Sequence, residues 1–296
     1  MTTIAISGAS GQLGRLTAEF LLERVHPSSV VLLTRSPERL ADLVERGATV
    51  RAADFNDPDG VTAALQGVHR FLLISTDTVG ARLDQQVAAI QAAKAAGVGH
   101  VLYTSAPEPS AENPAVVNPD HLGTEQALQA SGLTWTILRN NLYAEFQVQE
   151  GAPAVASGRL FTNAPDGKVA WVSRVDLARA AAAVLTADAG HENAVYELGG
   201  AESLTRRDFA AILTEVTGRP VEVVAVNDAG LTAGLEAAGI PDFVATVLAS
   251  FGAAAREGYL DLPSDIIERL TGQPARPLRD VLAAAKDELL AAPAAH

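Results

Sequence analysis

The first residues whose spacing indicates a chemical function are three glycines, Gly8, Gly11 and Gly14, which come shortly after the apolar residues 4–6. A short strand, the spacing G-x-x-G-x-x-G and a helical stretch at 15–23 are typical of a turn that binds a dinucleotide, because glycines let backbone N–H groups approach a pyrophosphate. The free N–H groups and the positive dipole end of the helix would face the phosphates. A tight turn without a ligand is the alternative. The expected dinucleotide contacts are Gly8, Ser10, Gly11, Gln12 and Leu13.

The second apolar run, residues 30–34, ends at Arg35, about twenty residues beyond the glycines. NAD-dependent enzymes usually carry Asp or Glu at this point, where the carboxylate binds the ribose hydroxyls. An arginine, together with Arg39, would instead bind a 2′-phosphate through charge-assisted hydrogen bonds. Arg35 therefore favours NADPH over NADH, and a solvated loop arginine is the alternative interpretation.

Strand-like and helix-like segments alternate along the first half of the chain, which predicts an α/β fold with a doubly wound parallel sheet of the Rossmann type. Further strands are expected at 48–53, 70–76, 101–105 and 134–139. Ligands of such folds bind beyond the carboxyl ends of the strands. The expected cofactor contacts there are Arg35, then Asp54 and Phe55 beside the adenine, Ser75, Thr76 and Asp77 on the ribose and nicotinamide side, and Thr104, Arg139 and Asn140.

The pattern of the chain changes after residue 141. Ser173 and Thr205, each followed three residues later by an aspartate, have the spacing of capping boxes and predict helices that begin at these points. The remainder is mostly helical. We expect residues 1–150 to form the dinucleotide-binding domain, 168–200 to return to its sheet, and 201–296 to form a smaller, mixed but mostly helical, substrate-facing domain.

Composition limits the class of protein. The chain of 296 residues has no cysteine, which excludes disulfides and thiolate metal sites, and no His, Asp and Glu cluster has the spacing of metal ligands, so we expect no metal. The net charge of -13 offers no basic surface to nucleic acid. Neither a leader-like N-terminus nor an apolar run long enough for a membrane is present. We expect a cytoplasmic protein that acts on a small organic molecule, and a homodimer is compatible with the sequence.

Four features together resemble the NmrA-like branch of the atypical short-chain dehydrogenases. They are the glycine motif at 8–14, Arg35, the Leu-Arg-Asn-x-x-Tyr stretch at 138–143 and the Gly-His-Glu-Asn-x-x-Tyr-Glu-Leu stretch at 190–198. Within that branch the chain is most similar to the bacterial NADPH-dependent quinone oxidoreductases of type 2 and the triphenylmethane dye reductases. The resemblance covers nearly the whole chain and implies NADPH as the cofactor. It also implies contacts to the nicotinamide ribose and the substrate from Arg139, Asn140, Asn141 and Tyr143, and a cofactor-lining position for Trp171.

Two residues typical of short-chain dehydrogenases are missing. Those enzymes reduce ketones with a tyrosine and a lysine four residues later, but the matching positions here hold His121 and Glu125. A quinone spreads the charge of an incoming hydride and a triarylmethyl cation cancels it, so both acceptors have little need of a positioned acid. We therefore expect direct hydride transfer from the nicotinamide C4 to a flat, conjugated acceptor.

A tyrosine, an asparagine and a histidine are the main candidates for this chemistry. Tyr143 could wall the acceptor together with Trp171, Asn141 or Asn140 could orient the carboxamide, and His121 could donate a late proton. The alternatives are that Tyr143 and Trp171 are core or hinge aromatics and that His121 only bonds a loop.

The absence of the tyrosine and the lysine is equally consistent with a second class of function. Some NmrA-like proteins are regulators that bind NADP without reducing anything and pass that state to a partner. NADPH consumption with quinones or cationic dyes, and an open cleft beside the nicotinamide, would favour the reductase. Sugar-nucleotide epimerisation is a third possibility, and it is weakened because it also needs the missing tyrosine and lysine.

Overall fold

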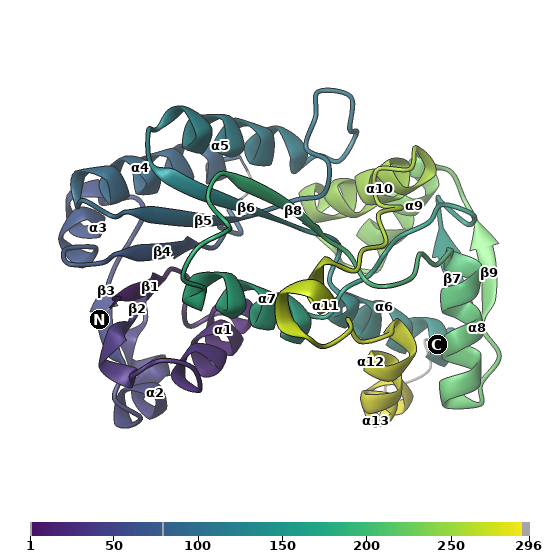
Figure 1. Cartoon of the computed structure of the whole chain (residues 1–296). Helices are drawn as coiled ribbons and strands as arrows, with labels where there is room; N and C mark the ends of the chain where they lie inside the picture. Colours follow the sequence, from purple (N-terminus) through teal and green to yellow (C-terminus); the bar gives the residue numbers. More distant parts are fainter. Residues whose placement is uncertain (1, 79, 292–296) are drawn as a thin grey trace.

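The computed structural model describes residues 2–78 and 80–291, and its centre is a seven-stranded parallel sheet in the order β3-β2-β1-β4-β5-β6-β8 (Figure 1). The chain starts in the middle of the sheet and winds outward in both directions, which confirms the predicted Rossmann-type sheet. The strands are β1 Ile4–Ile6, β2 Val30–Thr34, β3 Thr49–Ala52, β4 Arg70–Leu73, β5 His100–Ser105, β6 Thr134–Asn140 and β8 Ala194–Leu198.

Helices cover both faces of this sheet. One face is covered by α1 Gln12–Leu22, α2 Ala41–Glu45, α7 Arg174–Thr186 and α11 Ile266–Thr271, and the other by α3 Pro58–Ala64, α4 Arg82–Ala95 and α5 Asn118–Ala130 (Figure 1). Side chains alternate between the two layers, so Ile4 and Ile6 pack under α1 and α7 whereas Ala5 packs on the opposite side. Burial of both faces explains why the central strands β1 and β2 appear in the sequence as almost unbroken apolar runs. Within the part of the chain described, every helix is too short or too polar to cross a bilayer.

β4 ends at Leu73, earlier than the sequence pattern predicts. The hydroxyl of Ser7 accepts the Ile74 N–H at 2.8 Å, and the hydroxyl of Thr104 accepts the Ser75 N–H at 2.9 Å. Because side-chain oxygens from the neighbouring strands replace the backbone ladder, the chain leaves the sheet here. The residues after Ser75 therefore lie in a loop beyond the carboxyl end of the strand.

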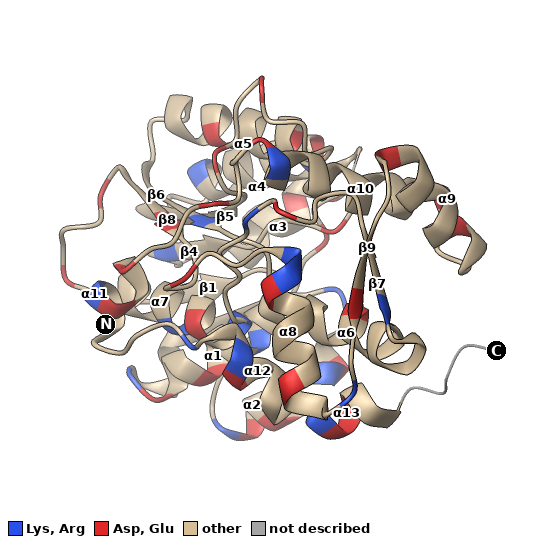
Figure 2. Ribbon diagram, turned by 90° about the vertical axis from the view of Figure 1, so that its right-hand side faces the viewer, with Lys and Arg blue, Asp and Glu red and all other residues tan. Residues whose placement is uncertain are grey.

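A second lobe stands beside the main sheet (Figure 1). Its elements are α6 Ala144–Ser157, β7 Arg159–Thr162, α8 Arg206–Thr217, β9 Glu222–Ala225, α9 Asp228–Ala237, α10 Asp242–Arg256, α12 Leu278–Ala284 and α13 Lys286–Ala291. β7 and β9 form a separate two-stranded parallel sheet, and α6 joins the apolar core of the lobe. α9 packs on α10 and projects outward, with no buried residue of its own (Figure 2). The domain limits expected from the sequence stay a prediction, but the core of this lobe already includes Ala144.

Both predicted helix starts are confirmed. Ser173 Oγ accepts the Asp176 N–H at 3.1 Å at the start of α7. Thr205 Oγ1 accepts the Asp208 N–H at 3.1 Å, and the Asp208 carboxylate accepts the Thr205 N–H at 2.9 Å, which completes a capping box at α8. Since α7 leads into the parallel strand β8, its N-terminus lies at the carboxyl edge of the sheet, like that of α1.

Candidate active site

The glycine turn between β1 and α1 has the geometry of a phosphate-binding site. Gly8 has a φ of 59°, and its carbonyl accepts the Gly11 N–H at 2.9 Å. Gly11 caps α1 without a side chain, so the N–H groups of Gln12 and Leu13 are available to a ligand. A Cβ on Gly14 would lie 2.4 Å from the Gly8 carbonyl oxygen, so only glycine lets the helix approach the turn this closely. The turn fits the pyrophosphate of a dinucleotide.

Arg35 lies beside that turn at the end of β2. The hydroxyls of Ser10 and Thr34 are 2.9 Å apart, and the Ala9 N–H donates to the Leu33 carbonyl at 3.2 Å. These bonds fasten the turn to the strand. Arg35 is exposed directly after Thr34, so its guanidinium is free to reach a phosphate bound near the turn.

The end of β3 continues this edge. The Ala53 N–H donates to the Thr34 carbonyl at 3.1 Å, which places the following residues next to Arg35. Asp54 is exposed, and Phe55 is half-buried against the layer under α3 and α4. The structure thus brings together the three residues predicted for the adenine end of the cofactor, Arg35, Asp54 and Phe55, beyond the ends of β2 and β3.

Three buried polar atoms at the carboxyl edge of the sheet have no hydrogen-bond partner among the described residues. They are Thr76 Oγ1, Ser105 Oγ and Asn140 Oδ1, which lie at or just beyond the ends of the neighbouring strands β4, β5 and β6. A buried polar atom left unpaired costs about 1–3 kcal/mol, so a ligand that bonds to it removes a penalty. The ribose hydroxyls and carboxamide of NADPH carry the required donors and acceptors. The residues present therefore fit this cofactor.

Ser75, Asp77 and Thr104 complete the same edge. Thr104 Oγ1 accepts the Ser75 N–H at 2.9 Å and lies 3.5 Å from the Ser75 hydroxyl. These contacts hold Ser75 and Thr104 together at the carboxyl edge of the sheet, whereas Asp77 is exposed.

His121 lies in a buried network near the start of α5. Its Nδ1 is 2.9 Å from the Tyr103 hydroxyl, and its Nε2 is 3.1 Å from Nη1 of Arg82. Since an arginine can only donate, Nε2 is the acceptor and Nδ1 carries the proton. Burial, and secondly the charge of Arg82, lower the pKa of His121 to about 3. The ring is therefore neutral near pH 7, and the late proton transfer expected from the sequence would have to start from a neutral imidazole.

We expect His121 to make the fold less stable in acid. The pKa is about 3 in the folded chain and 6.5 for an unperturbed histidine, so between these values only the unfolded chain binds the proton. The free energy of unfolding should fall as the pH drops through this window, with a slope of up to about 1.4 kcal/mol per pH unit. Denaturation by guanidinium at several pH values measures the slope. His121→Gln should have a smaller slope, and equal slopes for the two proteins would contradict this assignment.

Tyr143 lies between β6 and α6, where a wall for the acceptor is expected. Its ring is nearly parallel to that of Phe146, with an angle of 12° and centroids 5.8 Å apart. The guanidinium carbon of Arg174 lies 4.6 Å from the Tyr143 centroid and 4.5 Å from the Phe146 centroid. Glu145 holds Arg174 by accepting its backbone N–H at 2.9 Å. Sequence reasoning missed Phe146 and Arg174, although two aromatic residues spaced i, i+3 at a helix start were a usable signal.

Asn141 and Trp171 lie deeper than the sequence suggested. Asn141 Nδ2 donates to the Leu260 carbonyl at 3.1 Å, and its Oδ1 accepts the Leu142 N–H at 2.8 Å. Trp171 is 3% exposed and packs in the core of the second lobe, with its ring centroid 5.9 Å from that of Phe209. Asn141 joins the loop after β6 to the second lobe, and the cofactor and substrate contacts expected of both residues stay predictions.

Arg139 has partners that the sequence did not suggest. Its Nε and Nη2 donate to the two carboxylate oxygens of Glu125 at 2.9 and 2.7 Å, and its Nη1 donates to Glu197 at 2.8 Å. The cofactor contact expected of Arg139 stays a prediction. In the structure its guanidinium bonds two carboxylates, and these bonds join α5, β6 and β8.

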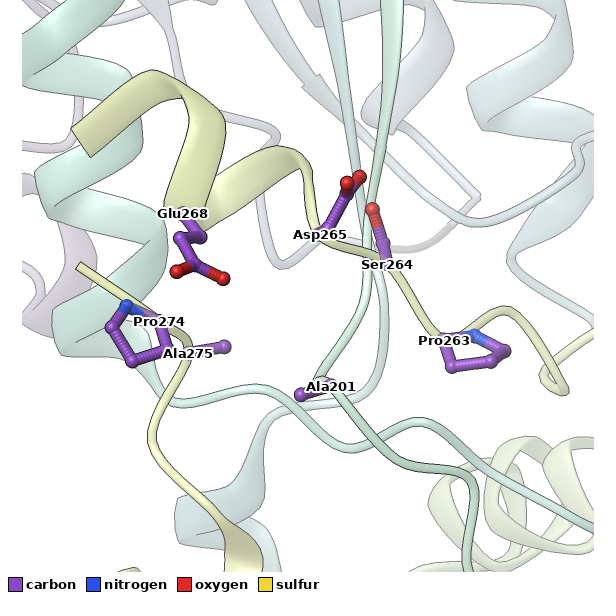
Figure 3. A pocket seen from close by; sticks show the side chains of 7 residues that line it. All are labelled: Ala201, Pro263, Ser264, Asp265, Glu268, Pro274 and Ala275. Atoms are coloured by element: carbon purple, nitrogen blue, oxygen red, sulfur yellow. The ribbon is translucent and has the colours of Figure 1, made fainter. Parts of the chain in front are cut away.

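A separate pocket of about 200 Å³ lies where the chain beyond β8 meets α11 (Figure 3). Asp265 and Glu268 line it together with Ser264. Oδ1 of Asp265 is 3.9 Å from Nη1 of Arg269. None of the residues predicted for the cofactor or the acceptor lines this pocket. The candidate active site is therefore the carboxyl edge of the main sheet, where the predicted residues lie.

Comparison with protein families shows to which family the chain belongs. A model of the NAD(P)H-binding family matches residues 8–188, a span that runs from the glycine turn to the end of α7. The chain belongs to the NAD(P)H-binding family. Membership of this family agrees with the glycine turn and with the strand order.

Individual relatives are similar over almost the whole chain. Quinone oxidoreductase 2 of Escherichia coli is 39% identical over 277 residues, which are 94% of this chain and 96% of that protein. The crystal structure of the NADPH-dependent quinone oxidoreductase QOR2 from Escherichia coli with NADPH has a TM-score of 0.92 and 39% identity, and covers 95% of this chain and 99% of that one. The Citrobacter sp. triphenylmethane reductase complexed with NADP(H) has a TM-score of 0.87 and 34% identity, and covers 96% and 99%. The resemblance inferred from the sequence motifs is confirmed.

Proposed function

We propose that this chain is an NADPH-dependent reductase that transfers a hydride directly to a conjugated, electrophilic acceptor such as a quinone or a triarylmethane dye. The observation that carries the proposal is the environment of His121 and Glu125, which occupy the positions where short-chain dehydrogenases have tyrosine and lysine. His121 is enclosed and neutral, and Glu125 is bonded to Arg139, so neither supplies the acid that ketone reduction needs. The relatives named as quinone and triphenylmethane reductases act on acceptors that tolerate its absence.

The strand ends and the glycine turn would hold the cofactor. The N–H groups at the start of α1 would bind the pyrophosphate, and Arg35 would bind the 2′-phosphate. Thr76, Ser105 and Asn140 would bond the nicotinamide end through their unpaired oxygens. When bound, NADPH supplies the hydride from its C4 atom.

The loop after β6 would shape the space beside the nicotinamide. Tyr143 and Phe146 form a flat aromatic surface on which a planar acceptor can stack, and Phe146 is 48% exposed and so accessible. Asn141 fixes this loop by its bond to Leu260 of the second lobe. An acceptor stacked here would displace water and lie in a fixed orientation, which would lower the entropic part of the barrier.

Two measurements test the proposal. Calorimetry with NADPH tests binding, and absorbance assays with menadione and with crystal violet test turnover. Binding together with oxidation of NADPH by either acceptor supports the reductase. Binding without turnover of any quinone or dye would instead favour a regulator that senses the NADP state, and absence of binding would contradict both functions.

Replacing Arg35 with aspartate should reverse the cofactor preference. The variant loses a charge-assisted bond worth about 1.5–3 kcal/mol, so NADPH should bind roughly 10- to 100-fold more weakly. NADH should bind more tightly, since the new carboxylate can accept the ribose hydroxyls. Calorimetry with both nucleotides measures the two affinities. Arg24→Asp, at an exposed position by the other end of α1, is the matched control, and an unchanged preference in Arg35→Asp would contradict the role of Arg35.

A further inference from the structure

Arg82, the first residue of α4, is a buried cation without an acidic partner. It is 8% exposed, yet no carboxylate of the described residues lies within salt-bridge distance. Arg139, Arg174 and Arg206 are also largely buried, and each of them pairs with a glutamate. Arg82 instead donates from Nε to the Thr76 carbonyl and from Nη1 to the His121 ring. Its charge is therefore held in place by neutral groups.

The surroundings leave this charge largely uncompensated. Burial lowers the pKa of Arg82, while Tyr103, Asp120, Asp77 and Tyr143 raise it from a distance. A guanidinium nevertheless stays protonated in proteins. Within the described chain, Nη2 makes no hydrogen bond, so one donor group of this fixed cation has no partner. Such a cation is expected to bind an anion more strongly than a surface arginine does, because burial strengthens the electrostatic attraction.

Arg82 is connected by hydrogen bonds to the ends of two neighbouring strands, β4 and β5. Thr76 follows β4, and His121 bonds the Tyr103 hydroxyl of β5. Tyr143 follows β6 and is close enough for the charge of Arg82 to lower its pKa against the larger, opposing effect of burial. His121 occupies the position at which short-chain dehydrogenases carry their tyrosine. The cation bonded to its Nε2 therefore lies next to the place where an acid would act.

We propose that the guanidinium of Arg82 binds the acceptor oxygen that becomes negative during hydride transfer, and so replaces the missing acid by a fixed positive charge. This inference rests on the proposed reductase function. The C4–H bond of NADPH breaks, the hydride forms a new bond to the quinone, and NADP⁺ and a hydroquinone monoanion result. The monoanion then takes a proton from solvent. His121 and the Thr76 carbonyl are positioning groups, because they hold the guanidinium and touch no substrate.

The proposal distinguishes the two classes of acceptor. A neutral quinone gains a negative charge, which Arg82 stabilises in the transition state. A triarylmethyl cation becomes neutral, so Arg82 stabilises nothing and repels the dye on binding. Removal of the charge should therefore slow quinone reduction and leave dye reduction unchanged or faster.

Kinetics with both acceptors test this difference. In Arg82→Gln, kcat/KM for menadione should fall roughly 100-fold or more, whereas kcat/KM for crystal violet should stay the same or rise. Arg82→Lys, which keeps the charge, should recover part of the menadione activity. Arg70→Gln is the matched control, since Arg70 lies on the same strand-to-helix unit but at the opposite end of β4, where its Nη1 donates to the carbonyls of Leu185 and Ala187. It should retain the wild-type ratio of the two activities.

A spectroscopic titration tests the charge without turnover. The absorbance of para-nitrophenol reports its ionisation, and its apparent pKa when bound with NADP⁺ should be lower by about 1 unit in the wild type than in Arg82→Gln. Equal losses with both acceptors and an unchanged pKa of the bound probe would show that Arg82 is only structural. Failure of the wild type to reduce either acceptor would overturn the reductase function instead, and calorimetry with NADPH would still show that the variants are folded.

Discussion

Replacing Gly14 with alanine should abolish tight NADPH binding and destabilise the fold. The new Cβ would lie 2.4 Å from the Gly8 carbonyl oxygen and 2.9 Å from the Ala9 Cα, and both are backbone atoms that cannot rotate away. α1 must therefore move from the turn, which costs about 1–3 kcal/mol of stability. The displaced N–H groups no longer meet the pyrophosphate, so we expect affinity for NADPH to fall roughly 100-fold or more. Thermal unfolding and calorimetry measure the two effects.

A second glycine in a helix provides the control for this substitution. A Cβ on Gly234 in α9 would meet no atom within 4 Å, and the helix has no buried residue. Gly234→Ala should therefore raise stability by about 0.5–1 kcal/mol, because alanine loses less backbone entropy than glycine on folding. NADPH affinity should not change. If Gly14→Ala bound NADPH as tightly as Gly234→Ala, the glycine turn would not be the pyrophosphate site.

The parallel sheet could be predicted because each of its strands is a local signal. Buried strands such as Val30–Thr34 and His100–Ser105 are short runs with clear ends, and the glycine turn identifies the first strand of the sheet. β7 Arg159–Thr162 could not be found in this way. It has four residues, two of them exposed, and it pairs only with β9, about sixty residues later. Strands of this kind are specified by their partner rather than by their own sequence.

The site could be predicted where the backbone alone fixes it, and not where distant side chains decide. Gly8, Arg35 and Asn140 lie at strand ends, so their place follows from the strand order. The environment of His121 depends on Arg82 and Tyr103, which come from two other elements. A sequence pattern does not show that a histidine is enclosed, and so it does not show which side of its ring is occupied or that its pKa is depressed.

Replacing Arg139 with leucine should cost about 3–5 kcal/mol of stability, the second large effect that we expect. Glu125, whose side chain is 3% exposed, would lose both of its bonds to Arg139 and remain as a buried, unpaired carboxylate. Glu197 would lose its bond as well. Denaturation by urea measures the change in the free energy of unfolding.

The double variant Arg139→Leu with Glu125→Leu separates a structural role from a role in binding. Removal of both charges leaves no unpaired carboxylate on α5, so much of the lost stability should return, as it does when buried ion pairs are replaced by apolar side chains. If Arg139 only joins α5, β6 and β8, NADPH affinity of the folded double variant should stay close to that of the wild type. A variant that is stable but binds NADPH weakly would instead support the cofactor contact predicted from the sequence. The single variant Arg139→Leu cannot distinguish a structural role from a role in binding, because it also leaves the buried Glu125 carboxylate unpaired. The double variant removes that carboxylate, so a remaining loss of NADPH affinity would be due to the missing arginine.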